Sequence, residues 1–346
     1  MSKLKKILGI TLSILLVFSS IPVFAMAATS YTSDDGYLTY TVSNNKATIT
    51  DCDTSIGGAY TIPDTLGGYP VTAIGKYAFE DCKTLSNVTI PDSIISIGSY
   101  AFEDCSTLSN VTIPDSVTSL GSSAFYNCAS LSSITIGNGV TSIGNNAFYS
   151  CGVLSIVKIG NNVASIGDYA FYKCVCLGNI IIPDSVISVG EYAFGYCTAL
   201  TNVTIGTGVT SIGTGAFRNC LNLKSITIPA NVTSIVSGSI GFSSGGSTAG
   251  FTIYGYDDTA AETYANQHNF IFISLGEYVE PVDPDVDDPT TDDPTTDDPT
   301  TDDPAESCSH FCHSESSFVQ FFYKIIRFFW KIFGINQYCE CGAAHY

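Results

Sequence analysis

The sequence predicts a repeat solenoid built mainly of short β-strands, and three periodic observations support this prediction. An Ala-Phe pair recurs every 23 residues, a cysteine stands three residues after each Phe, and an aliphatic residue stands six residues after it. A fixed period of this length indicates stacked units that bury their apolar residues against their neighbours. The seven pairs end at Phe79, Phe102, Phe125, Phe148, Phe171, Phe194 and Phe217, and the cysteines are Cys82, Cys105, Cys128, Cys151, Cys174, Cys197 and Cys220.

Each repeat is expected to hold two short parallel strands and one tight helical turn, in a right-handed leucine-rich-repeat solenoid. Residues 108–113 have the pattern LxxVxI of a strand whose apolar side chains face inward, residues 114–116 (PDS) suit a turn, and residues 117–120 form a second strand. Gly121 is expected to permit a sharp bend. Residues 123–128 (SAFYNC) then form the helical turn that places Phe125 and Cys128 in the core.

The cysteines at the repeat position admit two interpretations. Neighbouring rungs of a solenoid lie about 4.8 Å apart, which is within the Cα range of a disulfide, so a disulfide ladder is geometrically feasible. Seven is an odd number, however, and small thiols pack well in a crowded interior. We favour reduced core thiols over the ladder.

The ends of the array have their own patterns. Residues 1–27 read as a secretory signal, with Lys3, Lys5 and Lys6 before an apolar stretch and a small-residue cleavage site at its end. Residues 28–75 are expected to form an N-terminal cap hairpin, turning at Asn44-Asn45, and an irregular first rung. The seven repeats span residues 76–236. Residues 237–275 read as a C-terminal cap with a Gly/Ser-rich loop at 237–250, a strand, a helix at 259–268 and a final strand.

The recurring residues resemble the BspA-like class of leucine-rich repeats. The motifs AFxxC, LxxIxIP and VTSIG recur in register about seven times, and the resemblance covers roughly residues 40–275. It implies an extracellular binding or adhesion module, found on secreted and surface proteins of bacteria and some protozoa, with no catalytic residues to carry over. The recurring residues are core residues, and they do not encode a ligand.

The strongly acidic balance is local. The net charge of the 346-residue chain is −19, and 13 acidic residues without any Lys or Arg lie between Glu277 and Glu306, which leaves about −6 for the rest. No basic face exists to neutralise phosphates, so nucleic acid is not an expected partner. Residues 276–306, with DDPTT in tandem, read as an extended acidic linker rather than a calcium site, because a disordered chain lacks the fixed oxygen cage of such a site.

The C-terminal segment, residues 307–346, differs in character from the rest of the chain. Residues 318–335 (FVQFFYKIIRFFWKIFGI) contain eight aromatic residues, and their basic residues follow a helical spacing on one stripe. Such a helix is expected at a membrane surface, against another surface, or in self-association. The residues expected to make these contacts are Phe321, Phe322, Lys324, Arg327, Phe328, Phe329, Trp330 and Lys331.

Cysteines and histidines flank this predicted helix. Cys308 and Cys312 precede it, and Cys339 and Cys341 follow it, so four thiolates could complete a tetrahedral zinc site. A straight helix of this length is about 27 Å long, so the two pairs meet only if the chain folds back or two tails pair. Zinc, disulfides and free thiols remain open for this segment, and no other cofactor is expected.

An enzyme is not expected from this sequence. The solenoid holds one histidine, His268, without a recognisable nucleophile arrangement, and the repeated acids such as Asp92, Asp115 and Asp184 stand in I-P-D-S turns. The expected function is non-enzymatic binding or adhesion to a protein or glycan on a host, matrix or neighbouring cell. The alternative is a structural or self-assembling surface protein that acts through its tail.

Two outward columns are the candidate contact surfaces. Tyr126, Tyr149 and Tyr172 follow the Phe in three consecutive repeats, so they should stack into one strip, and Tyr is a frequent interface anchor. The alternative is that they are partly buried rim residues. On the main sheet, Ile156 and Lys158 interrupt a Thr/Asn ladder that would otherwise simply tolerate water.

Overall fold

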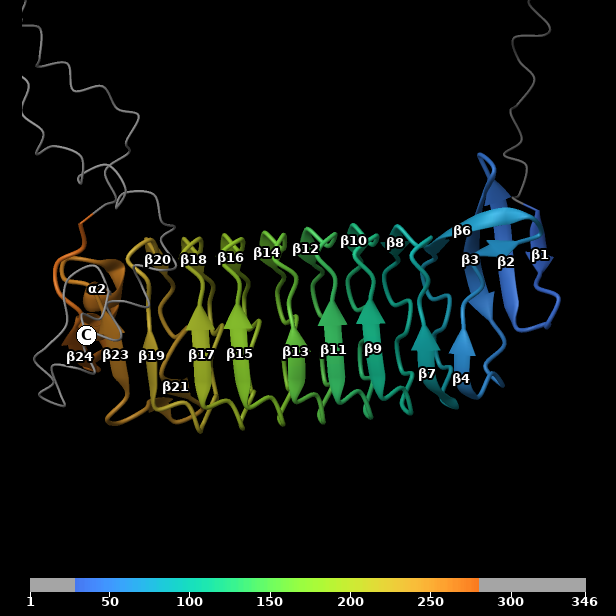
Figure 1. Ribbon diagram of the computed structural model, residues 1–346. Helices are drawn as coiled ribbons and strands as arrows, with labels where there is room; N and C mark the ends of the chain where they lie inside the picture. Colours follow the sequence, from blue (N-terminus) through green and yellow to red (C-terminus); the bar gives the residue numbers. More distant parts are fainter. Residues whose placement is uncertain (1–28, 280–346) are drawn as a thin grey trace, which may run out of the picture. The chain divides into compact units, whose positions relative to one another are not determined.

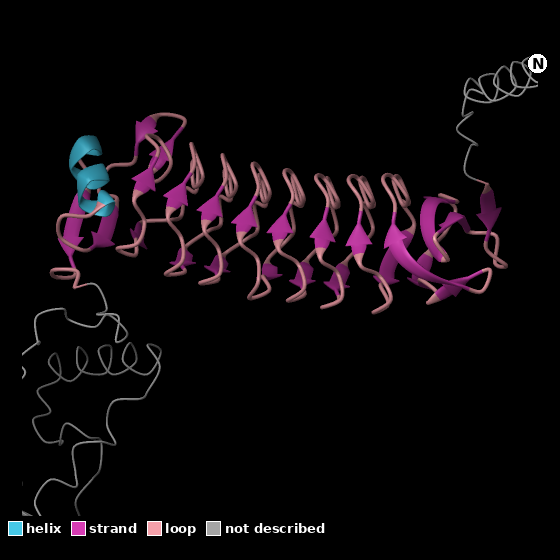
Figure 2. Cartoon of the chain, turned by 90° about the horizontal axis from the view of Figure 1, so that it is seen from above, coloured by secondary structure: helices cyan, strands magenta, loops and turns pink. Residues whose placement is uncertain are grey.

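The computed structural model describes residues 29–279, which form a solenoid of short parallel strands stacked one rung upon the next (Figure 1). Seen from above, each rung is a closed loop with a strand on either side, and the single helix lies at the C-terminal end (Figure 2). The predicted signal at residues 1–27 and the tail at residues 307–346 lie outside the described residues, as does all of the linker beyond Val279.

One side of the solenoid is a single 12-stranded sheet. After an antiparallel start, every repeat adds one two-residue strand in parallel, with serines 23 residues apart as Cα partners. In order, its strands are β1 (Ser30–Thr32), β2 (Leu38–Ser43), β3 (Lys46–Cys52), β6 (Tyr69–Ile74) with β5 (Thr65–Leu66) beside it, β8 (Ser96–Ile97), β10 (Ser119–Leu120), β12 (Ser142–Ile143), β14 (Ser165–Ile166), β16 (Ser188–Val189), β18 (Ser211–Ile212) and β20 (Ser234–Ile235).

The opposite side holds the longer strand of each repeat, and its ladder is interrupted. Five strands form one sheet, the next two a second, and the last three a third, all in parallel. They are β4 (Gly58–Thr61), β7 (Leu85–Thr89), β9 (Asn110–Ile113), β11 (Ser133–Ile136) and β13 (Ile156–Lys158), then β15 (Asn179–Ile182) and β17 (Asn202–Ile205), then β19 (Ser225–Thr227), β23 (Thr252–Gly255) and β24 (Ile271–Ser274).

The interior is a column of identical side chains. The seven Phe rings stack from one repeat to the next with centroids 4.9–5.5 Å apart, and each ring is at most 1% exposed. Beside them, the thiol of each cysteine from Cys105 to Cys220 donates a hydrogen bond to the carbonyl oxygen of the Phe in the preceding repeat, as Cys151 does to Phe125 at 3.2 Å. The nine described cysteines are free thiols, which confirms the preference for core thiols over a disulfide ladder.

The expected tight helical turns are built as successive hydrogen-bonded turns rather than as continuous helix. In the second repeat the amides of Glu103 and Cys105 bond back to the carbonyls three residues earlier, whereas the amide of Phe102 donates to Ala124 of the next repeat at 2.7 Å. Tyr100 and Asp104 also donate forward, and both have positive φ. Because alternate amides point along the stack, they are not free to bond within a helix.

The repeated glycine of the VTSIG motif has a different role from the one that the sequence suggested. Gly121 and Gly144 do not have positive φ, so they do not supply a special bend. A Cβ on Gly121 would lie 2.4 Å from the amide nitrogen of Ser99, and one on Gly144 would lie 2.6 Å from the carbonyl carbon of Gly121. The glycine is therefore required because adjacent rungs pass too close at this corner for any side chain.

Both ends of the array follow the expected plan. β2 and β3 form the predicted hairpin, with Asn44 and Asn45 in the left-handed conformation at its turn. At the other end the expected Gly/Ser loop continues the stack for one more rung: Phe217 donates to Ser239, and Ile240, 23 residues after Phe217, is fully buried. The same stretch carries a small hairpin, β21 (Phe242–Ser243) and β22 (Gly246–Ser247).

The helix α2 (Ala260–His268) closes the C-terminal end, one residue shorter than predicted. The hydroxyl of Tyr264 donates to the carbonyl of Ile240 and accepts from its amide, each at 2.9 Å, so the helix is bonded to the last rung. Within residues 29–279, no helix reaches the length and apolar character that crossing a membrane requires.

Candidate binding surfaces

The predicted tyrosine strip is present. Tyr126, Tyr149 and Tyr172 stack with ring centroids 4.8 and 4.9 Å apart, which matches the spacing of the Phe column directly beneath them. All three are half-buried, and their hydroxyl groups make no hydrogen bond to another described residue. The arrangement offers ring edges and free hydroxyl groups on a rigid backing, which suits contact with a partner at low entropic cost.

The strip is larger than the sequence analysis predicted. At its C-terminal end the ring of Tyr172 lies 5.1 Å from that of Tyr196 and 5.4 Å from that of Tyr169, and Tyr169 stacks on Tyr192 at 5.3 Å. These three tyrosines were missed, although the recurrence of Y-A-F gave a signal. We refer to the six residues as the tyrosine surface: Tyr126, Tyr149, Tyr169, Tyr172, Tyr192 and Tyr196.

A glycine allows the two tyrosine columns to merge. Gly195 stands at the position that Tyr172 holds in the preceding repeat, and a Cβ there would lie 3.0 Å from Cδ2 of Tyr172 and 3.0 Å from Cδ1 of Tyr192. The rings therefore pack over bare backbone. Lys173 adds a cation above the same group, with its Nζ 5.6 Å from the centroid of the Tyr172 ring.

Burial and neighbouring groups keep these phenols protonated. Burial raises the pKa of Tyr126, with further contributions from Tyr149 and Glu103, and burial together with neighbouring tyrosines raises the pKa of Tyr172. At the N-terminal end of the strip the pKa of Glu103 is also raised, first by burial and then by the carboxylates around it. These hydroxyl groups thus remain hydrogen-bond donors at neutral and mildly alkaline pH.

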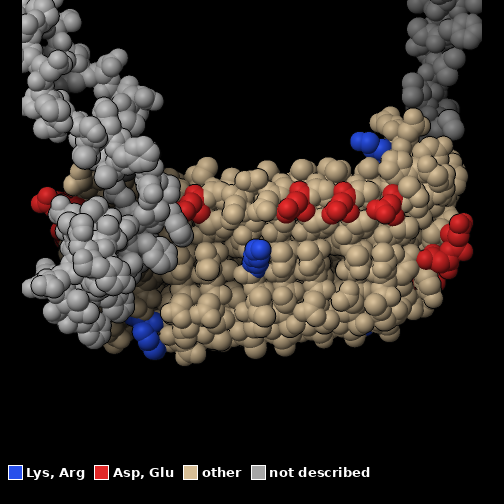
Figure 3. Space-filling view, in the orientation of Figure 1, with Lys and Arg blue, Asp and Glu red and all other residues tan. Residues whose placement is uncertain are grey.

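The face made by the longer strands is polar and flat in its first half. Asn87, Asn110, Thr89 and Thr112 are exposed in two columns, while Ser133 and Thr135 continue them half-buried. Figure 3 shows this face as largely uncharged, with a row of acidic side chains along one margin and a few isolated basic groups. The row comes from exposed aspartates in the turns that follow four of the strands, namely Asp64, Asp92, Asp115 and Asp184.

The predicted irregularity at Ile156 and Lys158 coincides with the interruption of the ladder. β13 pairs with β11 and β15 pairs with β17, but no ladder joins β13 to β15. Ile156 is 63% exposed, and Ile181, one strand later, is 68% exposed, so the interruption presents two isoleucines and the exposed Lys158 to solvent. Ile181 was recognised as outward-facing in the sequence but not as a contact residue.

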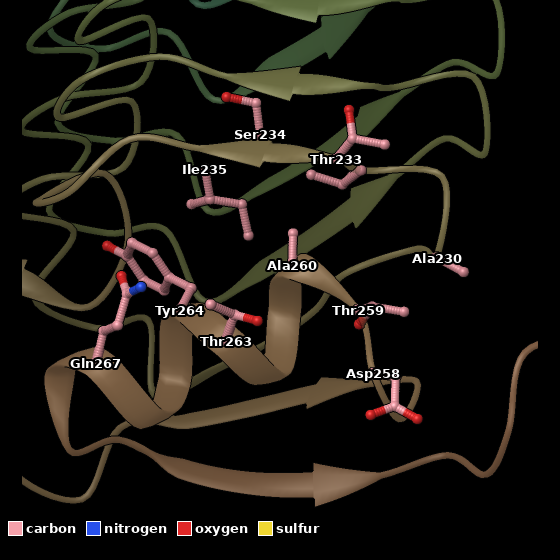
Figure 4. Close-up of a pocket in the computed structure, with 11 residues that line it drawn as sticks. Ala230, Thr233, Ser234, Ile235, Asp258, Thr259, Ala260, Thr263, Tyr264 and Gln267 are labelled. Atoms are coloured by element: carbon pink, nitrogen blue, oxygen red, sulfur yellow. The ribbon is translucent and has the colours of Figure 1, made fainter.

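A groove that the sequence did not predict lies between β20 and α2. It has a volume of about 570 Å³, and Ile235, Ser234 and Thr233 line one side while Tyr264 and Gln267 line the other (Figure 4). Ile235 is partly exposed here, whereas the equivalent Ile212 and Val189 of the preceding rungs are buried. The sole charged residue among its lining residues is Asp258, so the groove has no set of groups for acid–base or nucleophilic chemistry.

The remaining predicted residues lie outside the described part of the chain. These are the four cysteines proposed as zinc ligands and the contact residues of the tail, all beyond residue 306. Between residues 29 and 279 no group of three His, Cys, Asp or Glu side chains is placed to hold a metal ion. His268 is a packing residue, with its ring 4.6 Å from Tyr264 and 5.0 Å from Phe242.

Comparison with solved structures returns bacterial leucine-rich-repeat proteins. One from T. pallidum is 29% identical, with a TM-score of 0.49, and the match covers 57% of this chain and 89% of that one. One from Eubacterium ventriosum is 25% identical, with a TM-score of 0.45 and coverage of 62% and 50%. A protein described as a leucine-rich cell surface protein from Faecalibacterium prausnitzii is 24% identical, with a TM-score of 0.31 and coverage of 74% and 97%.

A search of curated proteins returned no match. The family model described as the BspA type leucine-rich repeat region matches six copies at residues 72–200 and 164–252, which together span just over half of the chain. Proteins built from these repeats are typically non-enzymatic, and the repeats are consistent with a protein-binding role. With its 23-residue period, its Phe and Cys columns and this match, the chain belongs to the BspA-type leucine-rich-repeat family.

Proposed function

We propose that the chain is a secreted or cell-surface adhesion protein that binds a partner on a host, matrix or neighbouring cell through the tyrosine surface. The observation that carries this proposal is the rigid stacking of Tyr126, Tyr149 and Tyr172 over the Phe column, with hydroxyl groups that no other described residue uses. Tyrosine contributes a large contact area with few rotatable bonds, so a pre-ordered row of rings loses little entropy on binding.

Two further observations support a binding role rather than a catalytic one. The groove at α2 lacks reactive groups, and the repeated acids stand in turns where their carboxylates accept backbone amides of the next rung, as Asp115 does from Asn138 at 2.6 Å. The acidic linker would present the solenoid away from the surface to which the tail attaches. The F. prausnitzii relative is described as a cell surface protein, which agrees with export of this chain.

The exposed Ile156, Ile181 and Lys158 form a second candidate contact on the opposite face. The interruption of the ladder between β13 and β15 favours it, because large apolar side chains are otherwise rare on this face of the repeats. The two candidates lie on different faces, so separate variants can distinguish them.

The test measures binding of the fluorescently labelled full chain to three probes: cells of the producing bacterium, cultured epithelial cells and immobilised mucin. The test variant carries Tyr126→Ser, Tyr149→Ser and Tyr172→Ser. A matched control carries Thr89→Ala, Thr112→Ala and Thr135→Ala on the opposite face. We expect saturable binding to at least one probe, with an affinity at least tenfold lower (about 1.4 kcal/mol) for the tyrosine variant and unchanged for the control.

Loss of binding by the threonine control alone would assign contact to the strand face and overturn the tyrosine assignment. Absence of saturable binding to all three probes would overturn the adhesion proposal in favour of a structural role. A variant with Ile156→Ser and Ile181→Thr tests the second candidate in the same assay.

A further inference from the structure

Exposed apolar residues gather at the last strand of the solenoid. Of the 17 exposed large hydrophobic residues, five lie in the last nine described positions: Ile271, Ile273, Leu275, Tyr278 and Val279. Ile271 and Ile273 continue the two outward columns of the strand face, where β19 has Ser225 and Thr227 in register. The change from polar to apolar side chains in the same columns sets β24 apart from the strands of the regular repeats.

The outer edge of β24 is also unpaired among the described residues. β24 pairs with β23 on one side, and α2 packs across β23 and β24 from the inner side. An edge strand that shows isoleucines 51% and 41% exposed is a site for association, and natural proteins usually cover such an edge with a helix or a loop. The cap therefore protects the interior of the solenoid but leaves this outer corner open.

We propose that residues 318–335 of the same chain pack as a helix over the outer face and edge of β24. The described chain ends at Val279, directly beside the apolar corner, and the predicted tail helix follows after about 38 residues of linker. A flexible tether of that length spans about 34 Å on average and holds the tail at a millimolar effective concentration. The aromatic face of the tail covers the isoleucines, while Lys324, Arg327 and Lys331 stay in water.

The charge of the linker favours this occupant over a membrane surface. The 13 acidic residues between Glu277 and Glu306 are repelled by anionic lipid headgroups, and this repulsion opposes the attraction of the three basic residues in the tail. The tether also favours contact within the chain over contact between copies, because its effective concentration exceeds that of a dilute second molecule.

The single tryptophan of the chain, Trp330, lies in the tail and provides the readout. In the full chain under reducing conditions we expect Trp330 to emit at the short wavelength of a buried indole, independently of protein concentration. Ile271→Ser with Ile273→Thr restores the residue types of β19, and both positions are exposed, so this variant is expected to fold. It should shift the Trp330 emission to longer wavelength and speed amide exchange in residues 318–335 at least tenfold.

The matched control is Ile156→Ser with Ile181→Thr, which removes two equally exposed isoleucines from the same face and should leave Trp330 unchanged. A solvent-exposed emission in the unaltered chain, or an equal response of both variants, would overturn the proposal. A short-wavelength emission that is lost on dilution would assign the corner to a second copy. Burial of Trp330 that requires added phosphatidylglycerol vesicles would assign the tail to a membrane, which also overturns the proposal.

Discussion

The Phe column inside the solenoid and the tyrosine strip outside it occupy adjacent positions in each repeat. Both stack at about the same spacing, 4.9–5.5 Å for the Phe rings and 4.8–4.9 Å for Tyr126, Tyr149 and Tyr172. The Phe is present in all seven repeats, whereas the next position holds Glu80, Glu103, the three tyrosines, Gly195 and Arg218. A missing interior ring leaves a cavity, so the interior repeats one residue, and departures from the period gather where solvent or a partner can meet the chain.

The largest expected effect concerns the thiols beside the Phe column. Burial raises the pKa of Cys151 and Cys220 to about 12, and that of Cys128, Cys174 and Cys197 well above 9.0. The folded state thus holds these protons more tightly than the unfolded state, so stability is complete below pH 9 and falls as the pH rises toward 12. The loss is about 1.4 kcal/mol per pH unit for each thiol.

Urea unfolding followed by circular dichroism between pH 7 and 11 measures this dependence. The urea midpoint should be flat to pH 8.5 and fall steeply above pH 9. A midpoint that stays constant to pH 11 would contradict the expected role of the neutral thiols.

The second prediction compares adjacent residues of one repeat. Phe148→Ala removes a fully buried ring from the middle of the column and should lower the free energy of unfolding by about 3–5 kcal/mol. Tyr149→Ala removes a half-buried ring and should cost much less, because its cavity opens to solvent. The urea midpoints of the two variants provide the measurement, and equal losses would show that the outer strip is as structural as the interior column.

The third prediction concerns the place where the tyrosine columns merge. Gly195→Ala puts a methyl group 3.0 Å from the rings of Tyr172 and Tyr192, so it should cost about 1 kcal/mol and displace both rings. Gly178→Ala is the control, since nothing lies within 4 Å of a Cβ there. Thermal unfolding and the binding assay are both read; a Gly195 variant that matches its control in both would remove Gly195 from the surface.

The smallest effect separates the one exposed cysteine of the described repeats from the buried ones. Cys176 is exposed, whereas the thiol of Cys151 is buried and its pKa is about 12. Iodoacetamide at pH 8 should therefore label Cys176 rapidly and leave Cys151 unlabelled until urea unfolds the chain, without a change in stability. Peptide mass spectrometry measures the two sites, and equal labelling rates in the native protein would contradict the burial of the thiol column.

Much of the fold could be predicted because the period states each contact seven times. Phe125 and Cys128 could be placed in the core from their spacing alone, and the stacking of Tyr126 on Tyr149 followed from the same rule. The role of Gly121 could not, because the approach of Ser99 depends on the next rung rather than on local conformation. Tyr192 and Tyr196 were missed since their contacts with Tyr172 run diagonally between columns.

The sequence by itself determined the rung, its inward residues and the order of the repeats, because a solenoid rung contacts only copies of itself and the period reports those contacts. Only the tertiary structure decided where the strand ladder is interrupted, which tyrosines meet across columns, and that β24 is left with an exposed apolar edge. These features arise from how far neighbouring rungs move or turn against each other. Such displacements leave the residue spacing unchanged, and the sequence therefore carries no periodic mark of them.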